Sequence, residues 1–179
     1  MTTDLPDLAL SVRQPWAWAI IHGGKVIENR TVGSIRAGKM DLRRIAIHAA
    51  SGMRKAEYDW AVWRMDQDRV QVPHPAVLPR GAIIGAVDVV DIVTESDSPW
   101  FGGPCGLVLE NPAACDPIPC TGALGYFRWT PGQNLAATSK WMRTYGVPNK
   151  DGVTRDLFDT EAPRFKKPPP KPFGPRPSR

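Results

Sequence analysis

The stretch that most constrains the fold is residues 10–30, where a short apolar helix runs directly into charged and polar side chains. Pro15 suits the first turn of a helix, where its missing N–H costs nothing, and Gly23 and Gly24 provide a stop. The apolar residues between them are too few to span a bilayer. The polar residues that follow are Lys25, Glu28, Asn29 and Arg30. This order predicts a helix packed beside the wall of a polar pocket.

The basic charge of the chain is concentrated at its C-terminal end. The sequence has 23 Lys and Arg against 18 Asp and Glu. Residues 163–179 hold six of the basic residues and no acidic one, so residues 1–162 hold 17 basic and 18 acidic residues, a net charge of −1. Seven of the 17 tail residues are proline, which predicts an extended, disordered segment. We therefore expect one domain over residues 1–162 and a proline-rich basic tail over 163–179.

Charge is also uneven within the expected domain. Residues 13–55 carry nine Lys and Arg against two acidic residues, whereas residues 57–116 carry three against ten. If residues 13–55 form one surface, that surface is basic, as in proteins that orient themselves on a polyanion. If the two segments interleave in space, their charges cancel. The sequence leaves both arrangements open.

Local patterns predict a mixture of strands and helices. Arg43–Ala49 places Ile45 and Ile47 on one face and polar residues on the other, as in a half-buried strand. Gly81–Val93 is rich in valine and isoleucine and gives the strongest strand signal. A helix from Ser51 to about Asp68 is expected to pack into the core through Met53, Ala56, Trp60 and Trp63. The other expected elements are a turn over 31–39, strands over 106–110 and 125–129 joined by a Pro/Cys-rich loop, and a short helix near 139–145.

Residues 23–30 resemble the signature of ASCH domains, a branch of the PUA-like superfamily. That signature reads Gly-x-Lys-x-x-Glu-x-Arg, and its four fixed positions are occupied here by Gly23, Lys25, Glu28 and Arg30. Gln14-Pro15-Trp16 and the blocks 78–93, 98–111 and 122–129 extend the similarity over about residues 8–130. The resemblance implies an α+β fold, a small PUA-like mixed β-barrel with flanking helices. It also implies a nucleic-acid-binding module, RNA favoured and DNA possible, that recognises a base, modified or not.

The expected base pocket combines cations, hydrogen-bonding groups and an aromatic face. Lys25 can meet a phosphate, and Arg30 can hold Glu28 for a hydrogen bond to a base amino group. Trp100, in a Gly/Pro-rich loop, is the preferred stacking residue, whereas Trp16 is expected to lie at one edge of the core. The predicted nucleic-acid-binding set is Ser11, Gln14, Trp16, Lys25, Glu28, Asn29, Arg30, His48 and Trp100. A structural ion pair at the helix–strand junction is the competing interpretation of Lys25, Glu28 and Arg30.

Two other functions stay open. One is a small hydrolase, either a ribonuclease or a modified-nucleoside amidohydrolase, with Lys25 and Glu28 as its catalytic residues. Amidohydrolases that are similar to ASCH domains have a threonine nucleophile three residues after the lysine, and this chain has Glu28 there. A carboxylate does not replace a hydroxyl in acyl transfer, so the resemblance favours a binding protein over an enzyme. The third function is a protein-interaction adaptor, in which the 163–179 tail docks a partner.

No feature of the sequence indicates a membrane segment, a secretion signal or a bound metal. There is no run of 18 apolar residues, and the N-terminal residues lack the features of a signal peptide. Cys105, Cys115 and Cys120 match no zinc spacing, and the three histidines do not complete one. The glycines at 102, 103 and 106 lack the Lys-Ser/Thr of a phosphate-binding loop. We expect a cytoplasmic protein with reduced cysteines, no cofactor, no membrane partner and nucleic acid as its ligand.

Overall fold

The computed structural model describes residues 5–146 of the chain. The described residues separate into two compact units, the first made of residues 5–52 and 79–136 and the second of residues 53–78 and 137–146. The predicted tail and the predicted domain boundary before it lie outside the described residues. Each unit is considered by itself below.

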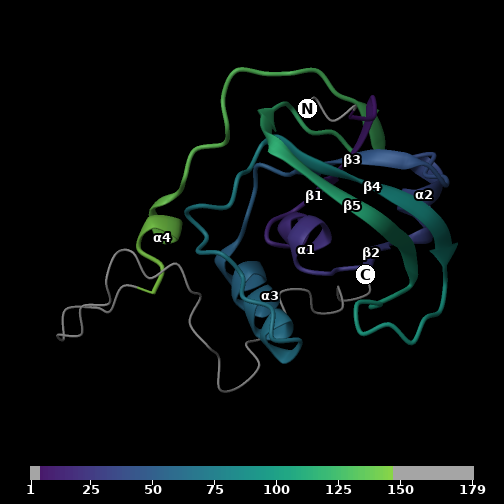
Figure 1. The fold of residues 1–179 in the computed structure, drawn as a ribbon, viewed down its shortest axis with the longest axis horizontal. Helices are drawn as coiled ribbons and strands as arrows, with labels where there is room; N and C mark the ends of the chain where they lie inside the picture. The colour runs from purple at the N-terminus through teal and green to yellow at the C-terminus, as the bar shows by residue number, and fades with distance from the viewer. Residues whose placement is uncertain (1–4, 147–179) are drawn as a thin grey trace, which may run out of the picture. The chain divides into compact units, whose positions relative to one another are not determined.

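The first unit is built on a curled, six-stranded mixed sheet. Its elements are β1 (Leu8–Val12), α1 (Trp16–His22), β2 (Ile27–Arg30), α2 (Val32–Ala37), β3 (Arg44–Ala49), β4 (Ala82–Val93), β5 (Cys105–Pro119) and β6 (Tyr126–Arg128). The strand order is β2-β5-β4-β3-β1-β6, with β1 parallel to β3 and the other neighbours antiparallel. Figure 1 shows the sheet curling around α1. This half-barrel confirms the α+β, PUA-like fold that the resemblance implied.

The two faces of the sheet have different environments. On the inner face, Leu10 of β1, Ile45 and Ile47 of β3 and Leu107 of β5 form one buried cluster with Ile20 of α1. Alternate residues of the same strands point to the outer face, because successive side chains of a strand take opposite sides. There a smaller cluster contains Ala9, Ala46, Ile83 and Cys120. The terms inner face and outer face are kept for these two sides.

Two elements of the first unit differ from the sequence prediction. The expected turn over 31–39 is the helix α2, which begins with a reciprocal cap: the Ser34 amide donates to the Thr31 hydroxyl at 3.1 Å and the Thr31 amide donates to the Ser34 hydroxyl at 3.1 Å. The expected loop after residue 110 continues as β5 to Pro119. Prolines are tolerated there because β5 pairs with β2 only through Cys105–Val108, so the rest of that edge needs no donors.

The second unit contains α3 (Lys55–Gln67) and α4 (Lys140–Arg143). The expected core stripe on α3 is wrong for Ala56, which is exposed, and Trp60 and Trp63 are half-buried, with ring centroids 4.8 Å apart. The buried face carries Tyr58 instead, whose ring meets that of Tyr145 edge-on at 4.9 Å. Aromatic packing with the segment after residue 136 therefore decides which face of α3 is buried, and the helix alone does not.

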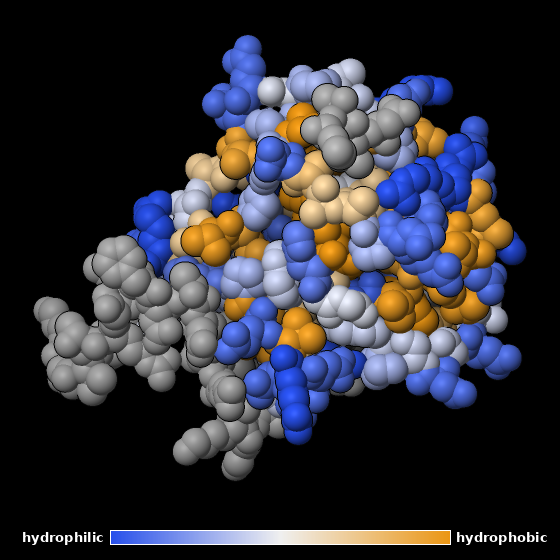
Figure 2. Space-filling model, viewed as in Figure 1, coloured by the Kyte–Doolittle hydropathy of each residue, from blue (hydrophilic) through white to orange (hydrophobic). Residues whose placement is uncertain are grey.

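Polar and apolar side chains are both exposed on the surface of the described residues. Figure 2 shows hydrophilic and hydrophobic side chains interspersed on the face that it displays. Val32 of α2 and Val90 of β4 are among the exposed apolar residues. Within residues 5–146, no helix combines the length and the apolar character needed to cross a membrane.

Candidate nucleic-acid interface

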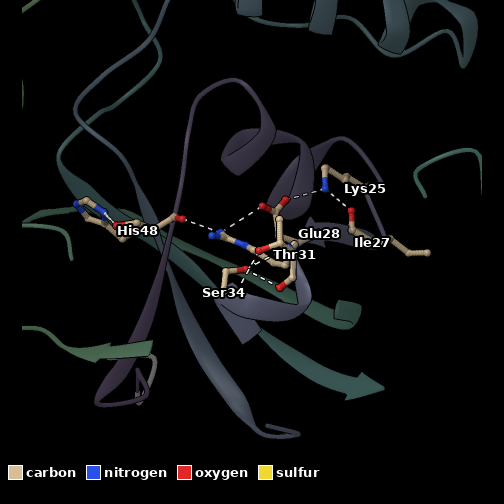
Figure 3. A network of polar contacts seen from close by, with 8 residues as sticks. Lys25, Ile27, Glu28, Thr31, Ser34 and His48 are labelled. Atoms are coloured by element: carbon tan, nitrogen blue, oxygen red, sulfur yellow. Dashed lines mark hydrogen bonds and ion pairs between the residues drawn. The ribbon is translucent and has the colours of Figure 1, made fainter. Parts of the chain in front are cut away.

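Lys25, Glu28 and Arg30 form one ion-pair network at the start of β2. Figure 3 labels Lys25 and Glu28 in it. The Lys25 ammonium donates to Glu28 Oε2 at 2.9 Å and also to the Ile27 carbonyl. Arg30 Nη2 lies 3.2 Å from Glu28 Oε1. Only 5% of Lys25 is exposed, and the side chains of Glu28 and Arg30 are exposed by 12% and 20%. The network is therefore largely withdrawn from water but not sealed.

The Glu28 carboxyl is ionised in this setting. Burial by itself raises the pKa of Glu28, but the charges and hydrogen bonds of Lys25 and Arg30 outweigh it, so the pKa lies below its usual value. Two cations thus hold one carboxylate in a poorly hydrated site. These contacts are those of a structural ion pair at the helix–strand junction. They also leave lone pairs of the Glu28 carboxylate free to accept a hydrogen bond from a ligand.

Arg30 connects this network to β1. Its Nη2 donates to the main-chain carbonyl of Ser11 at 2.9 Å, and its Nε is buried with no hydrogen-bond partner. A buried donor without an acceptor costs free energy, about 1–3 kcal/mol, unless a ligand or a water satisfies it. Arg30 is thus the member of the network with unused hydrogen-bonding capacity.

The sheet separates the predicted site residues into two groups. Ser11 pairs with His48 across β1 and β3, and both side chains point to the outer face. Glu28 pairs with Leu107, which belongs to the inner-face cluster, so the Glu28 carboxylate is on the opposite side of the sheet. In Figure 3, His48 lies at one end of the polar network and Lys25 at the other. One pocket cannot receive both groups of side chains.

On the outer face, Ser11 and His48 line a cavity of about 500 Å³. Ser11 Oγ lies 2.7 Å from His48 Nδ1, and His48 Nε2 lies 3.2 Å from the Cys120 carbonyl. Burial lowers the pKa of His48, although its bond to the Cys120 carbonyl opposes the shift. The ring is therefore neutral near neutral pH.

Gln14 holds the first turn of α1, and Trp16 is the first residue of that helix. Gln14 is fully buried; its Oε1 accepts from the Trp18 amide at 2.9 Å and its Nε2 donates to the Pro79 carbonyl at 2.9 Å. Both ends of the amide are thus engaged within the protein, which is a structural role. Trp16 is half-buried against the inner-face cluster, which confirms its expected place at the edge of the core.

Asn29 and Trp100 meet on the other side of β2 from Glu28. Asn29 Nδ2 donates to the Trp100 carbonyl at 2.8 Å, and the Gly102 amide donates to Asn29 Oδ1 at 2.7 Å. Asn29 therefore fixes the loop between β4 and β5. The Trp100 main chain is thereby held beside Asn29.

Tyr126 is an inner-face aromatic residue that the sequence prediction missed. It pairs with Leu10 across β6 and β1, packs against the inner-face cluster and donates its hydroxyl to the Asp41 carbonyl at 3.0 Å. Burial and Asp41 raise the pKa of Tyr126 to about 12, while the charges of Arg43 and Arg30 oppose the rise. The alternation of side chains along β6 tells which of its residues share a face. Which of the two faces is the inner one follows only from the pairing of β6 with β1.

The described residues contain no group of three or more His, Cys, Asp and Glu side chains placed to hold a metal ion. Cys105, Cys115 and Cys120 are free thiols, and burial raises the pKa of Cys115 and Cys120. Reactive thiolates are not favoured at these two positions.

The comparison with known proteins agrees with the fold and with the signature. No curated protein matches the chain. The family model of the ASCH domain matches residues 10–113, which run from within β1 into β5 and include the complete Lys25–Glu28–Arg30 network. The chain therefore belongs to the ASCH domain family.

Proposed function

We propose that this protein is a nucleic-acid-binding module that recognises an unpaired base, modified or not, on the inner face of its sheet. The observation that carries the proposal is the Glu28 carboxylate, kept ionised between Lys25 and Arg30 while still partly exposed. RNA is favoured over DNA because ASCH domains belong to a PUA-like group that is often associated with RNA binding. The proposed setting is the cytoplasm.

The chemistry of the network suits a base with an exocyclic amino group. Each Glu28 oxygen has one donor from the protein, and a carboxylate oxygen accepts more than one hydrogen bond. The amino groups of adenine, cytosine and guanine can donate to it. The buried Nε of Arg30 offers a donor in the same place. Tyr126, on the same sheet face, offers a ring for stacking nearer to this network than the sequence-predicted Trp100 loop does.

Cations beside Tyr126 suit the phosphates that flank such a base. The Tyr126 amide donates to the Gly38 carbonyl at 3.3 Å, which brings the C-terminal end of α2 beside β6. Arg36 and Lys39 flank Gly38 in sequence, and both are exposed. Contacts to phosphates position a nucleic acid without selecting its sequence, so these residues would supply affinity and Glu28 would supply the choice of base.

The hydrolase alternative gains less support from the same geometry. Lys25 acts as a base only without its extra proton, yet its ammonium donates to Glu28 and to the Ile27 carbonyl. Glu28 is likewise engaged with two cations. Binding therefore accounts for these contacts more directly than catalysis does.

Fluorescence anisotropy with labelled single-stranded RNA, single-stranded DNA and duplexes tests the proposal. Glu28→Gln should weaken binding of oligonucleotides rich in amino-bearing bases and have less effect on poly-U, since one bidentate or charged base contact discriminates by about 1–3 kcal/mol. Arg36→Gln with Lys39→Gln should weaken all sequences alike and lower the salt slope by roughly 1.4 for two phosphates.

Arg128→Gln is the matched control, because Arg128 is a cation of β6 whose side chain is 78% exposed and paired with Asp7. It should leave affinity and base preference unchanged. The proposal fails if Glu28→Gln and Arg30→Lys bind as the wild type does while deletion of residues 163–179 abolishes binding. RNA cleavage or nucleoside deacylation that disappears in Glu28→Gln would establish the hydrolase instead.

A further inference from the structure

The contact between Ser11 and His48 has a defined direction. A carbonyl oxygen only accepts hydrogen bonds, so the His48 Nε2 that faces the Cys120 carbonyl at 3.2 Å carries the ring proton. Nδ1 of the neutral ring then presents its lone pair to Ser11 Oγ at 2.7 Å, and the Ser11 hydroxyl donates to it. A serine hydroxyl, a neutral imidazole that accepts its proton and a third group that orients the imidazole form a nucleophile–base–orienter arrangement.

The Ser11–His48 pair lines a cavity in the first unit. Ser11 and His48 are among the residues that line the 500 Å³ space, and none of the lining residues is charged. Buried Arg80 fixes two of its walls by donating to the Ser51 carbonyl at 2.5 Å and to the Ala136 carbonyl at 3.4 Å. The size is within the range of small-molecule sites, roughly 300–1,000 Å³.

The lining of the cavity is uncharged and includes two exposed apolar side chains. Leu124 and Leu135 line it with 98% and 47% of their surfaces exposed. Gly122 lies directly beside the reactive pair: a Cβ placed on it would lie 2.6 Å from Ser11 Oγ. The same Cβ would lie 2.4 Å from His48 Cε1, so the Gly122 main chain packs directly against the pair, and a side chain here would displace the Ser11–His48 contact. The Ser11 hydroxyl is reached through the cavity that Ser11 lines.

We propose that Ser11 and His48 form a second site, an acyl-transfer centre for short, uncharged carboxylic esters, with Ser11 as nucleophile and His48 as general base. The site lies on the outer face of the sheet and is independent of the nucleic-acid interface proposed on the inner face. An uncharged substrate follows from the uncharged lining, and a short acyl chain follows from the small side chains beside Ser11.

The proposed reaction is a hydrolysis in which water is the second substrate. Ser11 Oγ forms a bond to the ester carbonyl carbon while its proton passes to His48 Nδ1. The bond from that carbon to the alcohol oxygen then breaks, and His48 returns the proton to the departing alcohol. Water attacks the acyl-serine, His48 takes its proton, and the carboxylic acid and free Ser11 are regenerated.

Labelling and turnover of the full-length chain test the proposal. A fluorophosphonate should form one covalent adduct per chain, located at Ser11 by peptide mass spectrometry. Hydrolysis of p-nitrophenyl acetate should exceed the buffer blank, fall to the blank in Ser11→Ala, and fall on the order of 100-fold in His48→Gln. Because wild-type labelling needs no variant, the test holds even if one variant folds poorly.

Ser96→Ala is the matched control, since Ser96 is an exposed serine of the loop between β4 and β5 and does not line the cavity. Its labelling and its rate should equal those of the wild type. The proposal is overturned if the adduct forms elsewhere or not at all, or if the rate persists in folded Ser11→Ala. Nucleic-acid binding is measured separately in Ser11→Ala and should be retained, so failure of this site leaves the inner-face proposal unaffected.

Discussion

Replacement of Lys25 by methionine should destabilise the first unit strongly. Lys25 is 5% exposed, and its ammonium donates to Glu28 Oε2 and to the Ile27 carbonyl. Methionine keeps an unbranched apolar stem of similar length but removes the charge and the donors. The substitution therefore leaves one buried carboxylate oxygen and one carbonyl without their partner.

The expected loss is about 3 kcal/mol. Removal of one partner from a buried ion pair costs about 3–5 kcal/mol, because the other charge stays buried without compensation. Glu28 still keeps Arg30 at 3.2 Å, which places the loss at the lower end of that range. The double variant Lys25→Met/Glu28→Gln also removes the charge of Glu28, so it should recover part of the lost stability. The coupling energy between the two substitutions should be about 1–3 kcal/mol.

Urea unfolding monitored by circular dichroism and tryptophan fluorescence measures the loss as a shift in the midpoint at an unchanged slope. Lys55→Met is the matched control: Lys55 pairs with Asp59, but its side chain is 58% exposed, so the same substitution there should cost less than about 1 kcal/mol. Coincident transitions of the two probes check that unfolding is two-state.

Acidification gives a second readout of the same contact. In the wild type the folded-state pKa of Glu28 is below the usual 4.5, so its contribution to stability is present above that pH and is lost as the pH falls through the folded pKa. Without Lys25 the carboxyl takes up its proton at a higher pH. The stability difference between wild type and Lys25→Met should therefore shrink as the pH falls. A difference below about 0.5 kcal/mol near neutral pH, or one that does not change with pH, would refute the reasoning.

Three further outcomes are expected. Asn29→Ala removes the two hydrogen bonds that hold the β4–β5 loop and should lower the free energy of unfolding by about 1–3 kcal/mol. Hydrogen exchange at the Gly102 amide should become faster, and unchanged exchange there would contradict the contact. Gly85→Ala introduces a Cβ that would lie 2.4 Å from the Ala113 carbonyl oxygen, a main-chain atom that cannot easily move aside. It should lower the free energy of unfolding by about 1–3 kcal/mol, and a stabilised variant would disprove the close packing. His48 has a folded-state pKa below 6.5, so protonation favours the unfolded chain and stability should fall as the pH drops below 6.5; His48→Gln should lose part of that pH dependence.

Strands with strong local patterns were predicted almost to the residue. Arg43–Ala49 and Gly81–Val93 were expected, and β3 and β4 each begin one residue later. Their alternating or continuous β-branched residues dictate an extended chain whatever lies beside them. The length of β5 was missed because its pairing with β4 includes register shifts near Pro117 that no local pattern reveals.

The signature predicted the ion-pair network but not its surroundings. Lys25, Glu28 and Arg30 meet as expected because the separation of Glu28 and Arg30 by two residues in a strand puts both on one face. Tyr126 comes beside Arg30 only through the pairing of β6 with β1, at a separation of almost one hundred residues. The main-chain carbonyl of Trp100, the stacking residue that the sequence predicts, accepts a hydrogen bond from Asn29.

By itself the sequence determined the family, the α+β class and the group of charges after α1, because these depend on short spacings within a continuous segment. Only the tertiary structure decided that Ser11 and His48 face away from Glu28. That division depends on the register between β1 and β3, which is set by contacts among residues far apart in the chain. A shift of one residue would move every side chain of β1 to the other face, so the separation into two candidate sites is a property of the folded sheet.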